Sequence, residues 1–463
     1  MIDKKTAKKV LDKLLESGGS FGEIFIQQKV LNNFRLDDNK IENASSGFEN
    51  GCGLRLIYKD STYYAFIDSR EKEKLLESAK ILSAAVNNSN INRALNLNDS
   101  ASSYNISILK YPDKVLPDEK KSILTEVNNT ARNKSSNIIQ VTATLFDSEE
   151  EILIANSEGV YASYFSVKAF LAVSTIAAKD REIRTGYKSF AKTRGFELFE
   201  EKKPADIAAQ SADMAINMLD AVNAPSGILP VVIGNGFGGV IFHEACGHGL
   251  EADAIIKNAS VFKDKIGKKI ASDMVTATDD STLAYHWGSY KFDSEGCPSA
   301  RNVLIEKGIL TSYLLDIKSA RKLNMSLTGN GRRQSYRDIP FPRMSNTFIE
   351  NGNEDPEIII SSVKKGIYAK EFSGGQVDPA TGDFVFGISE GYLIDNGKLS
   401  NPIKGATLIG NGPEILNKIE AIGNDLDYAP GFCGKNGQSV TNEVGQPTIK
   451  ISAITVGGTG HSE

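Results

Sequence analysis

The sequence has few cysteine and histidine residues and no long apolar run. It contains four cysteines and four histidines among 463 residues, and the cysteines are too few and too scattered for a disulfide-stabilised scaffold. The most apolar stretch, residues 228–242, is shorter than the roughly 18 residues of a membrane span and is interrupted by Asn235 and four glycines. The lysine-rich start of the chain lacks the apolar core of a signal peptide. We therefore expect a protein of the reducing cytoplasm that does not enter a membrane.

An excess of basic residues is also missing. Lysine and arginine number 53 against 58 aspartates and glutamates, which leaves a formal charge of −5. A mildly acidic chain has no electrostatic attraction for nucleic acid or for an anionic membrane surface. The hydrophobic fraction of 40% and the charged fraction of 24% are typical of a globular protein. The length corresponds to roughly three domains of about 150 residues each.

Short β-prone runs alternate with helical patterns along the chain and predict an α+β fold of several units. Residues 1–100 predict an N-terminal α/β module, and an exposed loop rich in asparagine and serine is expected over residues 87–105. Residues 101–222 predict a central α+β unit. Residues 223–463 are rich in glycine and short strands, and they predict a β-rich C-terminal domain that carries the helix of a metal site.

Two of the four histidines lie close together, in the segment His243-Glu244-Ala245-Cys246-Gly247-His248. Neutral imidazoles hold zinc in hydrolytic enzymes, and an adjacent carboxylate takes a proton from the water on the metal. The histidines of the common H-E-x-x-H pattern are four apart, whereas these are five apart, which separates them by about 140° around a regular α-helix. One wider π-type turn, eased by Gly247, would bring both onto one face. Two ordinary core or surface histidines are the alternative interpretation.

A catalytic zinc site needs a third protein ligand. The candidates from the residues alone are Glu251, Asp253, Cys246, Cys297, His286 and Cys433. Glu251 and Asp253 follow His248 closely and are suited to orienting the imidazoles. Cys433 stands in a glycine-rich loop near a lysine, where the backbone can approach an ion and a thiolate is favoured. The residues alone leave the choice open.

A second motif overlaps the first. Residues 229–233 predict a strand, and Gly234-Asn235-Gly236-Phe237-Gly238-Gly239 then satisfies the G-x-G-x-x-G pattern of dinucleotide-binding sites. That pattern requires a second parallel strand with an acidic residue about 20 residues further on, whereas the polar segment 257–269 follows here. We therefore interpret the glycines as a tight turn with close helix packing. A nucleotide-binding enzyme is the minor alternative.

Seven sequence blocks in a fixed order carry a resemblance to a known family. They are ASSG and GCGLR within 44–55, HEACGHGLEAD at 243–253, FDSEGCPSAR at 292–301, TGNGRRQSYRDIPFPRMSNT at 328–347, GGQVDPATGDFVF at 374–386, KGATLIGNGPEIL at 404–416 and GFCGKNGQSV at 431–440. Over nearly its whole length the chain resembles the TldD/PmbA family, and specifically its metal-bearing TldD branch. The resemblance implies a TldD/PmbA-like fold in which His243, His248 and Cys433 bind Zn²⁺ and Glu244 is the general base.

Seven residues of the remaining blocks are candidates for substrate binding: Asp293, Glu295, Arg332, Arg333, Tyr336, Gly374 and Gly375. The two acids would orient metal ligands or bind a substrate amine, and a polar turn is their alternative. The arginines and the tyrosine would stabilise an oxyanion or hold a peptide carboxylate, and a solvated basic turn is their alternative. The glycines would expose a sheet edge that pairs with an extended peptide.

The function predicted from these observations is a zinc-dependent peptidase. The resemblance implies hydrolysis of short or unfolded peptides by a dimer, either a homodimer or a pair with a metal-less PmbA-type homologue. The alternative is a non-catalytic regulatory or chaperone-like subunit whose metal is structural or absent. A protein ligand in the fourth coordination position would make such a metal structural.

Overall fold

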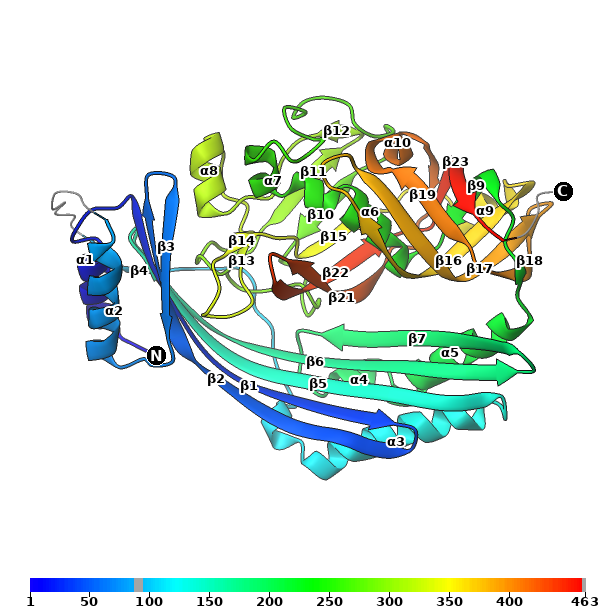
Figure 1. The fold of residues 1–463 in the computed structure, drawn as a ribbon, viewed down its shortest axis with the longest axis horizontal. Helices are drawn as coiled ribbons and strands as arrows, with labels where there is room; N and C mark the ends of the chain where they lie inside the picture. The colour runs from blue at the N-terminus through cyan, green and yellow to red at the C-terminus, as the bar shows by residue number, and fades with distance from the viewer. Residues whose placement is uncertain (87–94, 460–463) are drawn as a thin grey trace.

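A computed structural model of the chain describes residues 1–86 and 95–459. Figure 1 shows two layers: a long curved sheet, and above it a C-terminal half built of shorter strands. Helices α1 (Lys4–Leu14) and α2 (Lys72–Ala84) lie at one end of the long sheet. The α+β class predicted from the sequence is confirmed. The first part of the loop expected over residues 87–105 lies outside the described residues.

One antiparallel sheet contains the long strands of both expected N-terminal units. Its order is β3-β2-β1-β5-β6, and both β7 and the short β4 pair with β6. The strands are β1 (Phe21–Asp37), β2 (Lys40–Tyr58), β3 (Ser61–Ile67), β4 (Asn98–Asp99), β5 (Ile138–Asn156), β6 (Val160–Lys179) and β7 (Glu182–Lys192). β1 pairs with β5 along most of its length, so the two units share one hydrogen-bonded sheet. The division near residue 100 stays a prediction.

The helices of this half follow the expected sequence signals. In α1, Val10, Leu11 and Leu14 are buried at helical spacing, and the Asp3 side chain caps the first turn. Helices α3 (Pro117–Asn133) and α5 (Pro204–Asn217) begin with a proline, which fits the first turn of a helix, and they pack on the outer face of the long sheet (Figure 1). The short α4 (Leu198–Glu201) precedes α5. Within residues 1–86 and 95–459, no helix is long and apolar enough to cross a bilayer.

The C-terminal half contains a closed ring of five strands, paired in the order β16-β9-β23-β19-β17 and back to β16. These are β9 (Gly227–Ile233), β16 (Lys365–Val377), β17 (Asp383–Asp395), β19 (Thr407–Asn411) and β23 (Ile449–Gly457). Three further strands extend it: β8 (Val222–Asn223), β18 (Lys398–Lys404) and β20 (Ile419–Ile422). Helices α9 (Pro356–Ser361) and α10 (Gly412–Asn417) lie beside these strands.

A second sheet of this half has the order β12-β11-β10-β15-β22-β21. Its strands are β10 (Ala277–Asp280), β11 (Arg301–Glu306), β12 (Ile309–Leu310), β15 (Asn346–Ile349), β21 (Asp427–Lys435) and β22 (Gln438–Gln446). A small ribbon joins β13 (Gly331–Arg332) to β14 (Phe341–Pro342). Helices α6 (Val240–Ala245), α7 (Ala252–Ile256) and α8 (Ile317–Leu323) complete the half.

The glycines of segment 234–239 permit close packing. A side chain on Gly239 would come within 2.6 Å of the Gly445 carbonyl oxygen on β22, and one on Gly238 would clash with Gln446 and Ile233. The next strand along the chain, β10, joins the other sheet rather than lying beside β9. The segment therefore lacks the βαβ unit of a dinucleotide site.

A buried ionic network joins the two halves. The Arg55 guanidinium on β2 lies 2.6 Å from a carboxylate oxygen of Glu23 on β1 and 2.6 Å from one of Glu295 in the C-terminal half. Arg333 of the C-terminal half also contacts Glu23. All four side chains are at most 1% exposed. Such pairs are costly to break from one side, because the partner is left buried with an uncompensated charge.

We expect Arg55→Met to lower the free energy of unfolding by about 3–5 kcal/mol, since it leaves Glu23 and Glu295 without their shared cation. Urea unfolding followed by circular dichroism measures this change. The control is Arg35→Met, which removes a half-exposed ion pair to Asp37 and should change stability little. Equal unfolding midpoints for the two variants would contradict a stabilising role of the network.

Candidate metal centre

The two histidines of the motif meet because the helix between them ends. α6 stops at Ala245, Cys246 has backbone angles outside the helical region, and a 3₁₀ turn follows over Gly247–Leu250. The π-type turn expected from the spacing is therefore wrong. A side chain on Gly247 would lie 2.2 Å from the Met344 sulfur, so this break packs tightly against a distant segment that sequence spacing does not show.

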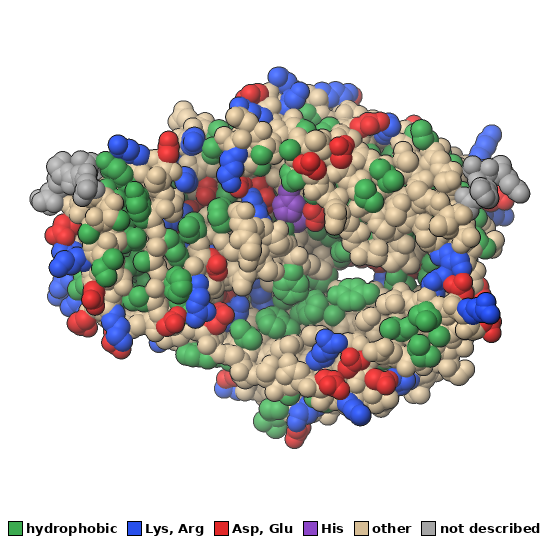
Figure 2. All heavy atoms as spheres, viewed as in Figure 1, with side chains coloured by type: hydrophobic (Ala, Val, Ile, Leu, Met, Phe, Trp, Pro, Cys, Tyr) green, Lys and Arg blue, Asp and Glu red, His purple; other side chains and the backbone are tan. Residues whose placement is uncertain are grey.

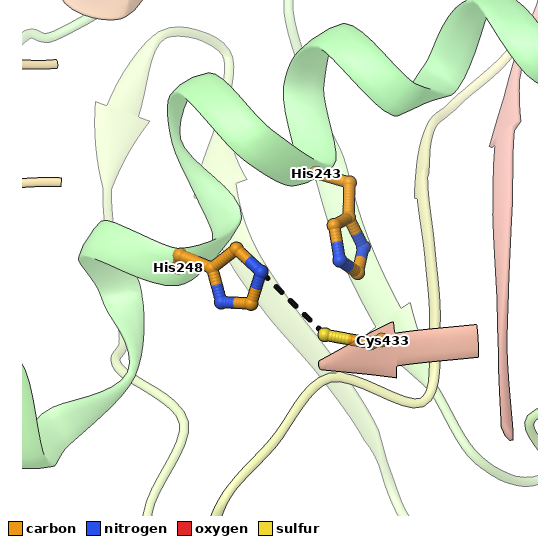
Figure 3. A group of neighbouring side chains, drawn as sticks. All are labelled: His243, His248 and Cys433. Carbon is orange, nitrogen blue, oxygen red and sulfur yellow. Dashed lines mark hydrogen bonds between the residues drawn. The ribbon is translucent and has the colours of Figure 1, made fainter. Parts of the chain in front are cut away.

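After the break, the His243 and His248 rings lie with centroids 5.0 Å apart and planes nearly perpendicular. Figure 3 shows both rings pointing toward Cys433. The His248 Nε2 atom is 3.5 Å from the Cys433 Sγ atom, and the possible donor atoms of the three residues lie within 4.8 Å of one another. Donors around a tetrahedral zinc ion lie roughly 3.3–3.8 Å apart, so two nitrogens and one sulfur in this arrangement fit a zinc site.

Cys433 lies on a strand rather than in the glycine-rich loop that the sequence suggested. It belongs to β21, opposite Val440 of β22, in a hairpin turned at Asn436 and Gly437, both with positive φ. The other candidate ligands lie elsewhere: Cys246 in the apolar core, Cys297 beside Gly329, and His286 against Glu443. Their side chains do not join the cluster.

Charges within the cluster favour the metal-binding form of the thiol. Burial raises the pKa of the Cys433 thiol, but the adjacent His243 and His248 rings outweigh burial and lower that pKa to about 4. Burial lowers the pKa of His248, yet Glu251 and Cys433 outweigh it, so this pKa lies well above its usual value. Both shifts favour the charged forms, a thiolate at Cys433 and an imidazolium at His248.

A chain of charges holds His248 in place. Its Nδ1 atom lies 3.0 Å from Glu251 Oε2, and the Lys435 ammonium lies 2.8 Å from the same oxygen and 2.6 Å from Asp253 Oδ1. Burial raises the pKa of Glu251, but Lys435 and His248 outweigh it and lower that pKa to about 2. The Nδ1 contact leaves Nε2 of His248 facing Cys433. Glu251 therefore lies where a partner of a metal-ligating histidine is needed, whereas Asp253 contacts Lys435 and no histidine.

The sequence analysis treated Lys435 only as a lysine that favours a thiolate at Cys433, and it assigned no role to Asn442 or Arg343. Lys435 holds Glu251, Asn442 Nδ2 lies 3.3 Å from His243 Nδ1, and Arg343 donates to the Cys433 carbonyl. The position of Lys435 two residues after Cys433 could have indicated that both side chains face the cluster, because residues two apart on a strand share a face. Asn442 and Arg343 offered no comparable local signal.

Glu244 stands at the end of α6, beside the cluster. Its Oε2 atom is 3.7 Å from His248 Nε2, and its side chain is 29% exposed. A carboxylate in this position reaches both the donor atoms and solvent. It is therefore placed to exchange protons with a water molecule at the cluster.

Most of the seven candidates for substrate binding contact other residues of the protein with their polar groups. Asp293 accepts hydrogen bonds from the backbone N–H groups of Glu295, Cys297 and Gly331, and the Tyr336 hydroxyl donates to Asp68. Glu295 and Arg333 belong to the network that joins the two halves.

Arg332 donates to the carbonyls of Met344 and Thr441. Gly374 and Gly375 lie in β16 opposite β17, and a side chain on Gly375 would clash with the Phe386 ring. A role of these seven residues in substrate binding stays a prediction.

Family models and related proteins match this chain along nearly its whole length. Three family models match in order: PmbA/TldA metallopeptidase domain 1 at residues 22–88, the central domain at 110–219 and the C-terminal domain at 226–458. A metalloprotease TldD homolog of Haemophilus influenzae is 38% identical, with 99% of this chain and 97% of the relative covered. A metalloprotease of Methanocaldococcus jannaschii is 35% identical over 93% of this chain and 95% of the relative.

Solved structures share the fold. TldE from Thermococcus kodakarensis has a TM-score of 0.78 at 21% identity, over 98% of each chain. A Thermotoga maritima protein described as a modulator of DNA gyrase has a TM-score of 0.79 at 20% identity, over 94% of this chain and 96% of its own. The fold and the relatives together define a metallopeptidase. The chain belongs to the TldD/PmbA family, which confirms the resemblance seen in the sequence.

We expect Lys435→Met to weaken zinc binding roughly 10–100-fold, because Glu251 then loses the cation that fixes it against His248. Competition with a fluorescent zinc chelator measures the affinity. Lys257→Met is the matched control: Lys257 lies 3.8 Å from the same Asp253 but is 65% exposed and is not paired with Glu251. Unchanged affinity in the Lys435 variant would show that the ion pair does not support the site.

We also expect zinc binding near pH 7 to release about one proton, since the pKa of Cys433 lies below that pH and the pKa of His248 is raised. Affinity should fall as the pH decreases, because more protons then compete for His248. Calorimetry in two buffers of different ionisation enthalpy counts the protons. His286→Asn, which alters a histidine–glutamate pair outside the cluster, should leave the count unchanged; zero release in the unaltered protein would contradict the charge state deduced here.

Proposed function

We propose that this protein is a zinc-dependent peptidase in which His243, His248 and Cys433 hold the metal. The convergence of two imidazoles and one thiolate from distant segments carries the proposal. A Saccharolobus solfataricus relative, 26% identical over 97% of this chain and 99% of its own, is named a zinc metalloprotease TldD homolog. Zinc bound by these residues would lower the pKa of a water molecule and polarise the scissile carbonyl.

Glu244 would act as the general base. It takes a proton from the attacking water and returns it to the leaving amine, and its partial exposure beside His248 suits this exchange. Glu251 holds the His248 ring in one orientation during these steps. The Cys433 thiolate donates more charge than a carboxylate would, so we expect moderate turnover.

The ligand count supports a catalytic rather than a structural site. Among the residues that the structure describes, the cluster has three members, and a closed structural zinc site has four protein ligands. A non-catalytic subunit with a structural metal is therefore the less favoured alternative. The Glu244 side chain beside the cluster is 29% exposed, which suits the access of a water molecule.

For substrates and assembly, the proposal follows the family resemblance. We propose short or unfolded peptides as substrates, in the cytoplasm, with the active form a homodimer or a pair with a metal-less PmbA-type homologue. The shared fold with TldE is consistent with such a pair. No role in nucleic-acid or membrane binding is proposed for a chain of net charge −5.

We expect Glu244→Gln to lower the rate of peptide hydrolysis by about 10²–10⁴-fold while zinc content stays the same, because the amide cannot accept the proton. A peptide-library digest, read by mass spectrometry, compares chelated, zinc-restored and Glu244→Gln protein, with elemental analysis of each sample. Glu306→Gln, at an exposed position on β11, is the matched control. Full hydrolysis by zinc-loaded Glu244→Gln protein would remove Glu244 from the mechanism, and no hydrolysis by any zinc-restored sample would contradict the proposed function.

A further inference from the structure

A cavity of about 270 Å³ lies between the long sheet and the β21–β22 hairpin. Strands β1, β5 and β6 form one wall, and the hairpin with residues 289–294 and 332–334 forms the other. Figure 2 shows the molecule hollowed between its two layers, with hydrophobic side chains inside the hollow. The volume is close to the lower end of the roughly 300–1,000 Å³ of small-molecule sites, so the cavity suits a small ligand.

This cavity is separate from the candidate metal centre. Phe432 and Thr441, which lie opposite each other in the hairpin, line the cavity. Their neighbours Cys433 and Asn442 contact the histidines instead. Because successive side chains of a strand point to opposite faces, the cavity and the metal centre occupy opposite faces of the hairpin.

Two cations at the cavity wall lack an acidic partner. Lys168 on β6 donates to the hydroxyl of Thr441, and Arg332 donates to the carbonyl of the same residue at 2.7 Å. Within the part of the chain that the structure describes, neither side chain forms an ion pair with a carboxylate. The oxygens of Thr441 and two aromatic rings compensate these charges: Lys168 lies over the Trp287 ring and Arg332 over the Tyr290 ring.

The other charges of the cavity are already matched. Arg333 is paired with a buried glutamate of β1, and Asp293 is held by three backbone N–H groups. Glu150 accepts a hydrogen bond from the Gln27 side chain and stands opposite Lys29 across β5 and β1. The unmatched positive charge is therefore concentrated around Thr441, between Lys168 and Arg332.

An anion placed there would be stabilised by both cations. Burial, together with Arg332, lowers the pKa of the Lys168 ammonium to about 7. A bound carboxylate would restore its charged form and form charge-assisted hydrogen bonds. The Phe146, Tyr164 and Phe432 rings add apolar surface to the same cavity, which suits a ligand with one anionic and one apolar group.

We propose that this cavity binds the C-terminal carboxylate of a short peptide, with the carboxylate between Lys168 and Arg332 and the last side chain on the aromatic surface. The choice of a peptide rests on the proposed function, because free phosphate shares the anionic chemistry but lacks the apolar group. The site would hold a peptide end away from the metal centre and would favour short chains with a free C-terminus.

The test compares an acetylated alanyl-phenylalanine dipeptide as the free acid and as the amide, by calorimetry on the zinc-loaded full chain carrying Glu244→Gln. We expect the acid to bind at least about tenfold more tightly, because the amide keeps one carbonyl acceptor but loses one charge-assisted hydrogen bond. Equal dissociation constants for acid and amide would overturn the proposal. Inorganic phosphate should compete with the acid only weakly, and phosphate binding tighter than that of the acid would overturn the peptide assignment.

Variants of Lys168 make the test specific. Lys168→Met should reduce the preference for the acid, because only Arg332 then remains to bind the carboxylate, and Lys168→Arg, which keeps the charge, should retain it. Lys192→Met on the neighbouring strand β7 is the matched control, since Lys192 also lies over an aromatic ring but does not line the cavity. An undiminished preference in Lys168→Met protein with unchanged circular dichroism would overturn the proposal.

Hydrolysis assays separate this proposal from the proposed function. If zinc-loaded protein with Glu244 intact hydrolyses acid and amide peptides with the same KM, the carboxylate site is wrong and the peptidase assignment stands. If the protein binds the acid preferentially but hydrolyses no peptide, the peptidase assignment is wrong and the carboxylate site stands. A higher KM for free-acid peptides in Lys168→Met protein, with unchanged kcat, supports both.

Discussion

The candidate metal centre depends on one line of buried charges that connects two distant parts of the sequence. Lys435 on β21 contacts Glu251, and Glu251 contacts His248. Because Lys435 and Cys433 point to the same face of β21, the ion pair that orients the imidazole also places the thiol. Neither the 243–251 segment nor the hairpin supplies all three donors, so the site exists only where the two segments pack together.

The sequence predicts best what is determined locally. The buried stripe of α1, the prolines that begin α3 and α5, and the close histidine pair each depend on residues within a few positions of one another. The break at Cys246 and the strand that carries Cys433 depend instead on distant contacts. Gly247 packs on Met344, and Cys433 pairs with Val440 in a hairpin that closes against the helix segment. Periodicity carries no information on such contacts.

Charged residues were the hardest to interpret from the sequence. A solvated basic turn was the alternative for Arg333, yet its side chain is fully buried against Glu23. Arg55 was not singled out, although it stands between Leu54 and Leu56 in a strand and is 1% exposed. An arginine between two apolar residues of a strand indicates that its side chain is buried. A buried arginine in turn requires a buried acidic partner. Which acid it meets is decided by the packing of the two halves.

The closed ring of strands has a consequence for how the family can diversify. Helix α6 rests on β16 and β17, which belong to this ring. In an open sheet, a strand that shifts by one residue against its neighbour turns its side chains to the other face. In a closed ring, such a shift would require all strand pairs to change register together. The strands beneath His243 should therefore keep their register when the surrounding loops change in length, and the candidate metal centre should keep its support.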